Sequence, residues 1–526
     1  MRSRGLIGVV AAVMAVAVAC ASGDATSRTD LSCFGRTPTL VGTDDADVLL
    51  GTAESDVIVG LGGNDTIHGL GGKDYLCGGS GADVISGGSG RDRLKGGSGD
   101  DTLSGGSGGD RLYGQGGNDA LSGDAGSDTA VGGGGADTCV AETTQGCEAG
   151  TAAHPIVDTG QTTFYDSSDA ITTPGASNPL SGQDAGHAGL QPGYADNGDG
   201  TITDKVTGLM WQRDPGEKMT YAQAVAGAAG FDLAGHHDWR LPTIKELYSL
   251  ILFSGTDPSG CENLPSCDAV PFIDTEYFMF EYGDEAAGER MIDSQYASST
   301  KYVSTTMNGD ETVFGVNFAD GRIKGYGLQL FGQAKTFFVL YVRGDTGYGV
   351  NDFVDNGNGT VTDAATGLMW QQADSGQGLE WESALGYCAA LGTGGYDDWR
   401  LPDAKELQSI VDYTRSPATT GSAAIDLLFV VSAITDEGGG SDFPFYWAGT
   451  THANLVSGAN AVYVAFGRAL GWMQSPSGAY TLLDVHGAGA QRSDPKTGDS
   501  AAFPHGHGPQ GDVVRIDNYA RCVRGG

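Results

Sequence analysis

Aspartate recurs at every ninth residue through a long stretch of the chain. Eleven consecutive nine-residue units run from Gly42 to Val140, and each has Asp at its sixth position. These residues are Asp47, Asp56, Asp65, Asp74, Asp83, Asp92, Asp101, Asp110, Asp119, Asp128 and Asp137. Carboxylate oxygens are hard ligands that suit a hard cation such as Ca²⁺. The register therefore predicts a series of calcium sites with one aspartate from each unit.

Glycines in the same units can supply backbone oxygens. Each unit opens with Gly, and the fourth position is also Gly from the third unit onward. Closely spaced glycines let the backbone turn tightly, so that carbonyl oxygens converge near the carboxylate. We expect backbone ligands at Gly60, Gly63, Gly69, Gly72, Gly78, Gly81, Gly87, Gly90, Gly96, Gly99, Gly105, Gly108, Gly114 and Gly117.

The elements that hold these sites follow from the eighth position, which is apolar from Leu49 to Leu121 and then fades to Ala130 and Cys139. Nonapeptide repeats of this kind are typical of a calcium-binding parallel β-helix. The units resemble the RTX, or haemolysin-type, calcium-binding repeats. The resemblance implies an all-β solenoid, a parallel β-roll in which two units form one coil. Units two apart then stack and share an ion, Asp65 with Asp83 and Asp74 with Asp92.

A disordered acidic linker is the alternative for this segment. Such linkers do not hold Asp in phase through eleven units. Residues 42–140 contain sixteen acidic and five basic residues, a balance of −11. Because this charge repels itself without cations, we expect folding of the segment to be coupled to calcium binding.

The whole chain is acidic, with 66 Asp and Glu against 29 Lys and Arg among 526 residues and a formal charge of −37. This balance argues against a nucleic-acid partner. It also disfavours anionic membranes and polyanionic sugars unless a local basic patch exists.

The first 20 residues predict export. Arg2 and Arg4 precede an apolar run from Leu6 to Val18, and an A-x-A cleavage site ends at Ala19, as in a Sec signal peptide. Cys20 follows directly and is a candidate for lipidation, which would be the only route to the membrane; plain secretion is the other reading. RTX toxins leave the cell by a C-terminal signal, so toxin function is not carried over.

Cysteine usage fits an oxidising compartment. Apart from Cys20 there are eight cysteines, which can pair in 105 ways. Proximity favours Cys33 with Cys77, Cys139 with Cys147, and Cys261 with Cys267, which leaves Cys388 for Cys522. The first two pairs would close the ends of a stacked solenoid.

The second half of the chain is a tandem duplication. Residues 194–204 and 207–212 return 159 residues later, and residues 237–247 return 160 residues later. In each copy, an Asn-Gly turn predicts a β-hairpin. Residues 221–229 and 381–391 have helical spacing, and a second helix should begin after Pro242 and Pro402.

These motifs resemble the Lcl C-terminal domain family, named for a Legionella collagen-like adhesin. The resemblance rests on D-N-G-[DN]-G-T-[IV]-T-D, T-G-L-M-W-Q, D-W-R-L-P-x-x-K-E-L and the closing segment from Val514 to Arg524. It implies two α+β, C-type-lectin-like modules, residues 155–346 and 347–526, that serve adhesion and bind glycans. A roll over residues 33–150 precedes them. Copy one lacks the counterparts of Cys388 and Cys522.

Three motifs in the duplicated half have a structural interpretation. Asp196, Asp199 and Asp204 do not match an EF-hand, because Ala195 and Val206 fall on two ligand positions. Arg240 with Glu246 and Arg400 with Glu406 are expected to be buried struts rather than substrate clamps. Trp211 and Trp370 are expected in the core.

A polar segment from Asp484 to Asp512 occurs only in copy two and is the candidate ligand surface, through His486, Arg492, His505 and His507. Its histidines could also hold a transition metal, although no third ligand is set by spacing.

The chain lacks G-x-S-x-G, H-E-x-x-H and phosphate-loop motifs. We therefore expect a calcium-binding exported adhesion protein that is not an enzyme. One alternative is an oxidase on a formylglycine-generating-like scaffold with reactive thiols at Cys388 or Cys522. Another is a purely structural matrix protein.

Overall fold

The computed structural model describes residues 32–525 except 118, 124, 127, 135–137, 141–142, 146–153, 176–177, 188, 260, 262–266, 308 and 331. The chain divides into two compact units, one within residues 1–147 and the other within 148–526. The predictions for the signal peptide, Cys20, Asp137 and Cys147 fall outside the described residues.

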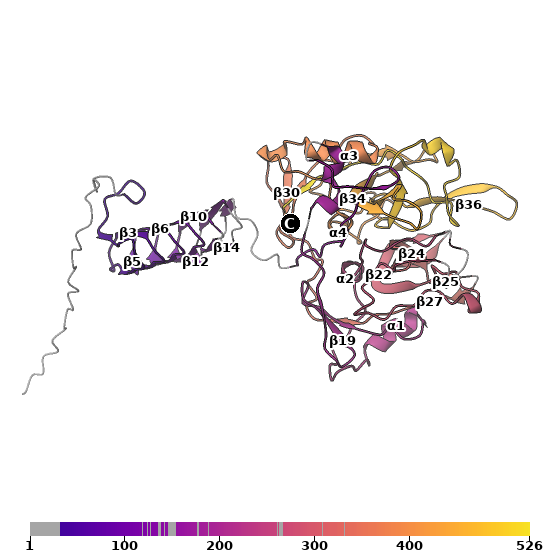
Figure 1. Cartoon of the computed structure of the whole chain (residues 1–526), viewed down its shortest axis with the longest axis horizontal. Coiled ribbons are helices and arrows are strands. Elements are labelled where there is room, and N and C mark those ends of the chain that lie inside the picture. Colours follow the sequence, from indigo (N-terminus) through magenta and orange to yellow (C-terminus); the bar gives the residue numbers. More distant parts are fainter. Residues whose placement is uncertain are drawn as a thin grey trace, which may run out of the picture. The chain divides into compact units, whose positions relative to one another are not determined.

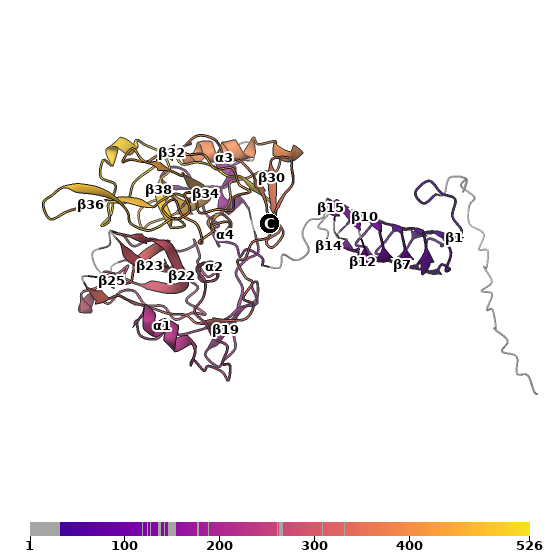
Figure 2. The same ribbon diagram turned by 180° about the vertical axis from the view of Figure 1, so that it is seen from behind.

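The first unit is a roll of two parallel sheets (Figures 1 and 2). One sheet contains β1 (Leu40–Val41), β3 (Val57–Gly62), β6 (Tyr75–Ser80), β8 (Arg93–Ser98), β10 (Arg111–Gly116), β13 (Thr129–Gly134) and β15 (Thr143–Gln145). The other contains β2 (Val48–Leu50), β4 (Thr66–His68), β7 (Val84–Gly90), β9 (Thr102–Gly108), β11 (Ala120–Ser122) and β14 (Thr138–Val140), with β5 (Gly71–Gly72) and β12 (Ala125–Gly126) beside them.

Strand pairing confirms that units two apart stack. Ile58 pairs with Leu76, and Ile67 pairs with Ile85, which is a register of two units in each sheet. Side chains of the eighth position point between the two sheets and are buried from Leu49 to Ala130. Each coil therefore contributes only two apolar side chains to a narrow core, as the repeat predicts.

A cap covers one side of the roll. Cys33 forms a disulfide with Cys77 on β6, and Phe34 lies edge-on to Tyr75 with ring centroids 6.2 Å apart. Arg36 stacks over the Tyr75 ring at 4.1 Å. The disulfide joins the pair expected from the sequence. Cys139 is also disulfide-bonded, but its expected partner is not among the described residues.

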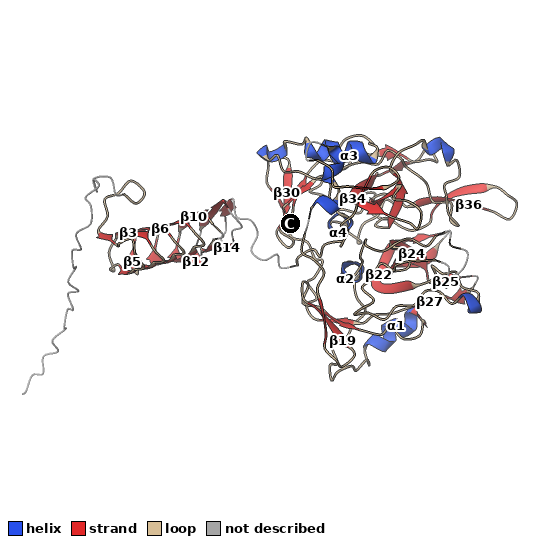
Figure 3. Ribbon diagram, in the orientation of Figure 1, coloured by secondary structure: helices blue, strands red, loops and turns tan. Residues whose placement is uncertain are grey.

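The second unit contains both copies of the duplication and is mostly β-structure with few helices (Figure 3). Each copy has a four-stranded antiparallel sheet that begins with the expected hairpin. In copy one these strands are β18 (Tyr194–Asp196), β19 (Thr201–Asp204), β20 (Met210–Gln212) and β28 (Val342–Arg343). In copy two they are β29 (Phe353–Asp355), β30 (Thr360–Asp363), β31 (Met369–Gln371) and β39 (Val523–Arg524).

Four helices form near the expected positions: α1 (Tyr221–Ala228), α2 (Ile244–Ser249), α3 (Trp381–Ala389) and α4 (Ala404–Ser409). Thr243 and Asp403 cap α2 and α4, and both caps are completed by the glutamate at the third helical position. Local sequence therefore explains where these two short helices start.

The two copies share one antiparallel sheet, which the sequence did not predict. Its order is β22 (Gln295–Thr306), β23 (Asp310–Asn317), β24 (Arg322–Gly327), β38 (Gln491–Pro495), β35 (Asn460–Ala465) and β34 (Phe445–His452). The first three strands come from copy one and the last three from copy two. They meet where Ile323 pairs with Gln491. The copies thus form one body with approximate twofold symmetry.

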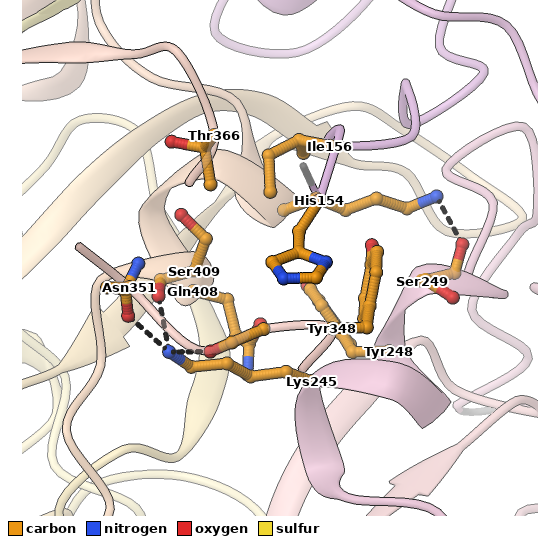
Figure 4. A pocket seen from close by; sticks show the side chains of 12 residues that line it. His154, Ile156, Lys245, Tyr248, Ser249, Tyr348, Asn351, Thr366, Gln408 and Ser409 are labelled. Carbon is orange, nitrogen blue, oxygen red and sulfur yellow. Dashed lines mark hydrogen bonds between the residues drawn. The ribbon is translucent and has the colours of Figure 1, made fainter. Parts of the chain in front are cut away.

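Two equivalent lysines join the copies across α2 and α4 (Figure 4). The Lys245 ammonium donates to the carbonyls of Ser409 at 2.6 Å and Gly349 at 2.9 Å. The Lys405 ammonium donates to the carbonyl of Ser249 at 2.8 Å. Each lysine therefore caps the end of the other copy's helix. The cavity between them has a volume of about 20 Å³, which is room for one water molecule rather than a ligand.

The copies differ in how helix and closing strand are joined. In copy two, Cys388 on α3 forms a disulfide with Cys522, and both residues are fully buried. In copy one, Tyr341 stands in the place of Cys522, and its hydroxyl donates to the Ala224 carbonyl on α1 at 2.8 Å. A hydrogen bond thus replaces the covalent link.

Smaller elements complete the unit. They are the strand pairs β16 (Phe164–Tyr165) with β17 (Ala170–Ile171), β21 (Met219–Thr220) with β27 (Thr336–Phe337), β25 (Gln329–Leu330) with β26 (Gln333–Ala334), β32 (Ile434–Thr435) with β33 (Ser441–Asp442), and β36 (Leu470–Gln474) with β37 (Tyr480–Asp484). Five 3₁₀ turns lie at Pro179–Gly182, Asp184–Gly186, Glu285–Ala287, Thr393–Gly395 and Ser500–Ala502. Among the described residues, no helix is long and apolar enough to cross a membrane.

Candidate functional site

The aspartates of the roll form two ladders that run along the stack. From Asp65 to Asp128, one oxygen of each carboxylate accepts the backbone N–H of the aspartate two units earlier. Asp83 Oδ1 accepts from the Asp65 N–H at 2.8 Å, and Asp92 Oδ1 accepts from the Asp74 N–H at 2.8 Å. The stacking expected for these two pairs is therefore confirmed.

The second oxygen of the same carboxylates has no hydrogen-bond partner in the middle of the roll. Oδ2 is buried and unpaired among the described residues at Asp65, Asp74, Asp83, Asp92 and Asp101. A buried carboxylate oxygen without a donor or a cation is costly. The ladders therefore contain a regular row of oxygens that fits a bound cation.

Glycine at the start of each unit leaves room for further oxygens beside this row. A β-carbon placed on Gly69 would lie 2.5 Å from Asp74 Oδ2 and 2.7 Å from the Gly87 carbonyl oxygen. The carboxylate and the carbonyl of the next coil thus converge at a point where any side chain would collide. Glycine at the fourth position has a different role, since Gly63 and Gly72 have φ of 95° and 109°.

Burial perturbs the titration of these carboxyls. Loss of hydration raises the pKa of Asp74 to about 6 and that of Asp101 to about 7. The backbone N–H bonds to these carboxylates lower the pKa, but by less than burial raises it. The pKa values of Asp65, Asp83 and Asp92 are also raised by burial. Carboxylates in this state gain most from a cation, because a nearby positive charge restores the ionised form.

The first two units differ from those that follow. Asp47 Oδ2 accepts from the Thr43 N–H at 2.6 Å and from the Thr43 hydroxyl at 2.8 Å. Asp56 Oδ2 accepts from Thr52 in the same way. The sequence analysis treated all eleven aspartates as equal ligands. The structure distinguishes the first two, whose second oxygens already have donors.

The donor set fits calcium. One carboxylate per unit and several carbonyls make an all-oxygen environment, which suits Ca²⁺ rather than a softer metal. No cluster of three His, Cys, Asp or Glu side chains is found in the described part of the chain, since these sites rely on backbone oxygens. Calcium bound there would neutralise the ladder and cross-link successive coils.

In the second unit, the motifs that resembled functional sites are structural. Arg240 donates to both carboxylate oxygens of Glu246, and Arg400 does the same to Glu406, with distances between 2.5 and 2.7 Å. Trp211 and Trp370 are fully buried. Asp196, Asp199 and Asp204 belong to the hairpin of β18 and β19. The hairpin and the buried tryptophans are confirmed, and the two predicted Arg–Glu contacts form with the glutamates buried and the arginines partly exposed.

The predicted ligand surface of copy two is wrong for two of its four residues. His486 and Arg492 are 2% and 8% exposed. Arg492 lies on β38, a central strand of the shared sheet, and the carbonyl of His486 accepts the Gly325 N–H of β24. His486 Nε2 lies 2.9 Å from Asp512 Oδ1, and Arg492 donates to the other oxygen of Asp512. Burial and the positive charge of Arg492 lower the pKa of His486 well below its usual value. These residues anchor a loop and cannot contact a ligand at the surface.

The anchored loop presents the remaining two residues, His505 and His507, which are exposed. The His505 ring stacks on Tyr480 with centroids 3.7 Å apart and an angle of 12° between the rings. Trp472 lies edge-on to His505 at 6.2 Å. Trp472 and Tyr480 belong to the β36–β37 hairpin, which projects from the body of the unit (Figures 1 and 2). Sequence reasoning missed both, because the hairpin precedes the segment from Asp484 to Asp512 that was predicted to form the ligand surface.

Together, the carboxylate ladder and the fused, mostly β unit define a calcium-binding repeat protein with a paired module. The RTX calcium-binding nonapeptide repeat model matches residues 41–76, 78–112 and 104–139. The chain belongs to the Lcl C-terminal domain family, whose model matches residues 200–343 and 359–483, just over half of the chain. Comparisons with curated proteins and with solved structures each found no match.

Proposed function

We propose that this protein is an exported, calcium-dependent adhesion protein that binds a glycan or matrix ligand through its paired modules. The observation that carries the calcium part is the row of buried, unpaired Oδ2 atoms from Asp65 to Asp101. RTX repeats and Lcl domains are typical of secreted or surface proteins, which supports export. The roll then acts as a stalk whose folding depends on extracellular calcium.

The aromatic cluster of Trp472, Tyr480 and His505 is our candidate for the glycan contact. Tyr480 is 40% exposed, and its ring is held in place by the stack with His505. Aromatic rings that are rigid, exposed and amphipathic suit the apolar face of a sugar ring and leave polar edges free for hydroxyl groups. The buried contacts of Asp512 with His486 and Arg492 support this cluster from beneath.

The oxidase alternative needs a reactive thiol at Cys388 or Cys522. Both residues are fully buried and joined in a disulfide, and this supports the proposal that the protein is a binding protein. The matrix-protein alternative differs from our proposal only in lacking a specific ligand.

A glycan array with the full chain in calcium tests the proposal. We expect hits that are weakened about tenfold by the double variant Tyr480→Ser with His505→Ala. The control Val456→Ala changes a side chain that is 90% exposed elsewhere in the same unit and should bind normally. Absence of hits across neutral and acidic sugars would favour a purely structural role, and hits unaffected by the double variant would place the ligand elsewhere.

A further inference from the structure

The basic residues of the roll are confined to one side. All five Lys and Arg between residues 42 and 140 fall in the fourth, sixth and eighth units: Lys73, Arg91, Arg93, Lys95 and Arg111. These units supply β6, β8 and β10, which lie along one side of the roll (Figure 1). The corresponding strand positions of the opposite sheet carry Thr66, His68, Val84, Ser86, Thr102 and Ser104. An acidic roll thus has one basic face.

Two tyrosines lie in register beside the cations on this face. Arg93 pairs with Tyr75 on one side and with Arg111 on the other, and Lys95 pairs with Tyr113. Neighbouring strands are about 4.8 Å apart, so charged groups and rings recur at a spacing comparable to that of successive sugars in a polysaccharide. The cap covers part of the face, because Phe34 lies against Tyr75 and Arg93 stacks over Phe34 at 4.5 Å. Tyr75 is therefore buried, and the open part of these strands contains Lys95, Arg111 and Tyr113.

These cations lack acidic partners. None of the five, nor Arg36 of the cap, forms an ion pair with any residue that the structure describes. The Arg93 Nε is buried without a hydrogen-bond partner. Lys73, Arg91 and Arg111 are exposed. The aspartates of the same units are buried in the ladders, so they do not neutralise the face.

An open groove follows the same face. It is lined by Leu61, Gly79, Lys95, Gly97, Ser98 and Gln115, among others, and has a volume of about 580 Å³. Gly79 and Gly97 pair with each other across β6 and β8, so part of its floor lacks side chains. A linear polymer can therefore lie in this groove, across the stacked strands, with Lys95 at the edge of the groove.

We propose that the open part of this face, defined by Lys73, Arg91, Lys95, Arg111 and Tyr113, binds an acidic polysaccharide. Its carboxylate or sulfate groups pair with the guanidinium and ammonium groups, and its sugar rings pack against tyrosine and glycine. The site goes beyond the proposed function, which places glycan binding on the second unit. The chain's charge of −37 disfavours polyanions in general, and the local basic face offsets that repulsion where the polysaccharide binds.

Binding of the full chain to polygalacturonate and to heparin, in calcium and at low salt, tests the proposal by calorimetry. The test variant carries both Lys95→Gln and Arg111→Gln. The control variant carries both Lys205→Gln and Lys301→Gln, which removes the same charge from exposed positions in the other unit. The first double variant should bind at least about tenfold more weakly and with a shallower salt dependence. The second should bind like the wild type.

Circular dichroism in calcium checks that both double variants retain their folded β-structure. The proposal is overturned if neither polysaccharide binds, if both double variants lose affinity equally, or if single-stranded nucleic acid binds as tightly with the same dependence on Lys95 and Arg111. Neutral dextran should not bind. The Tyr480 and His505 variant should leave this binding intact, so failure of the adhesion proposal would be seen separately.

Discussion

The two units differ in how they accommodate buried carboxylates. In the second unit, several buried acids are paired with cations of the chain itself: Asp257 with Arg322 at 2.7 Å, Asp320 with Lys324 at 2.7 Å, and Glu406 with Arg400. A buried acid without a cation, Asp184, accepts hydrogen bonds from the hydroxyls of Thr159 and Thr450. In the roll, the buried aspartates of the central coils receive one backbone N–H, and their second oxygen receives nothing. The missing positive charge must come from outside the chain.

Because of this difference, we expect the two units to have different requirements for folding. The second unit has large aromatic clusters and internal ion pairs, which stabilise it without a bound cation. The roll has a core two side chains wide in each coil and a charge of −11 over residues 42–140. We therefore expect calcium to govern the roll and to leave the second unit unchanged.

Breaking an internal ion pair in the second unit should have the largest effect. Arg400→Met leaves Glu406 buried and uncompensated, and we expect a loss of about 3–5 kcal/mol in unfolding free energy that does not depend on calcium. Urea denaturation followed by tryptophan fluorescence measures it. The control Lys301→Met breaks an exposed pair with Glu311 and should cost less than about 1 kcal/mol. A loss of unfolding free energy in Arg400→Met that depends on calcium would contradict the view that the second unit folds independently of calcium.

Removing one carboxylate from the ladder should change stability in opposite directions with and without calcium. Asp83→Asn keeps an acceptor for the Asp65 N–H but removes a buried charge. In calcium at about 100 times the dissociation constant, loss of one ion should cost about 2–3 kcal/mol. In chelator the same variant should stabilise the roll. Asp47→Asn, where Thr43 already donates to Oδ2, should show a smaller effect that is independent of calcium.

The calcium-free roll should become less stable as pH rises. Burial raises the pKa of Asp74 to about 6 and that of Asp101 to about 7, whereas an unfolded aspartate titrates near about 3.9. The folded state therefore binds these protons more tightly, so its stability is full below pH 4 and is lost as pH rises from about 4 to 7. Chelated protein should show more β-signal at pH 5 than at pH 7.5, and calcium should release protons between these values. An unchanged spectrum would contradict the assignment.

Relieving backbone strain in the roll should have the smallest effect. Leu70 has φ of 75° at a position where later units have Gly, and its side chain is 49% exposed. Leu70→Gly should therefore raise the unfolding free energy of the calcium-loaded roll by up to about 1 kcal/mol, which is measured as a higher thermal midpoint. Leu50→Gly is the matched control, because Leu50 is 60% exposed but has no positive φ, and that variant should destabilise.

Sequence reasoning succeeded where structure is local or periodic. The apolar eighth position predicted the core from Leu49 to Ala130, and the resemblance to RTX repeats implied the stacking of units two apart. The turn and Pro signals predicted the hairpins and helices. The different role of Asp47 was visible in principle, because Thr43 occupies a position where most later units have Gly.

Long-range pairing was beyond that reasoning. The contact between Ile323 and Gln491 joins strands 168 residues apart, and no local pattern specifies it. That pairing makes β38 central and buries Arg492, and His486 is buried beside β24, so two of the four predicted ligand residues anchor a loop instead. The distribution of Lys and Arg among the repeat units was readable from sequence, but only the two-sheet roll shows that they share a face.

Scanning calorimetry of the full chain, with saturating calcium and with chelator, tests the central claim most directly. We predict two transitions in calcium, of which chelator removes the one that belongs to the roll and leaves the other at the same temperature. Two transitions that are unchanged by chelator would show that the roll satisfies its own carboxylates, and would contradict the account.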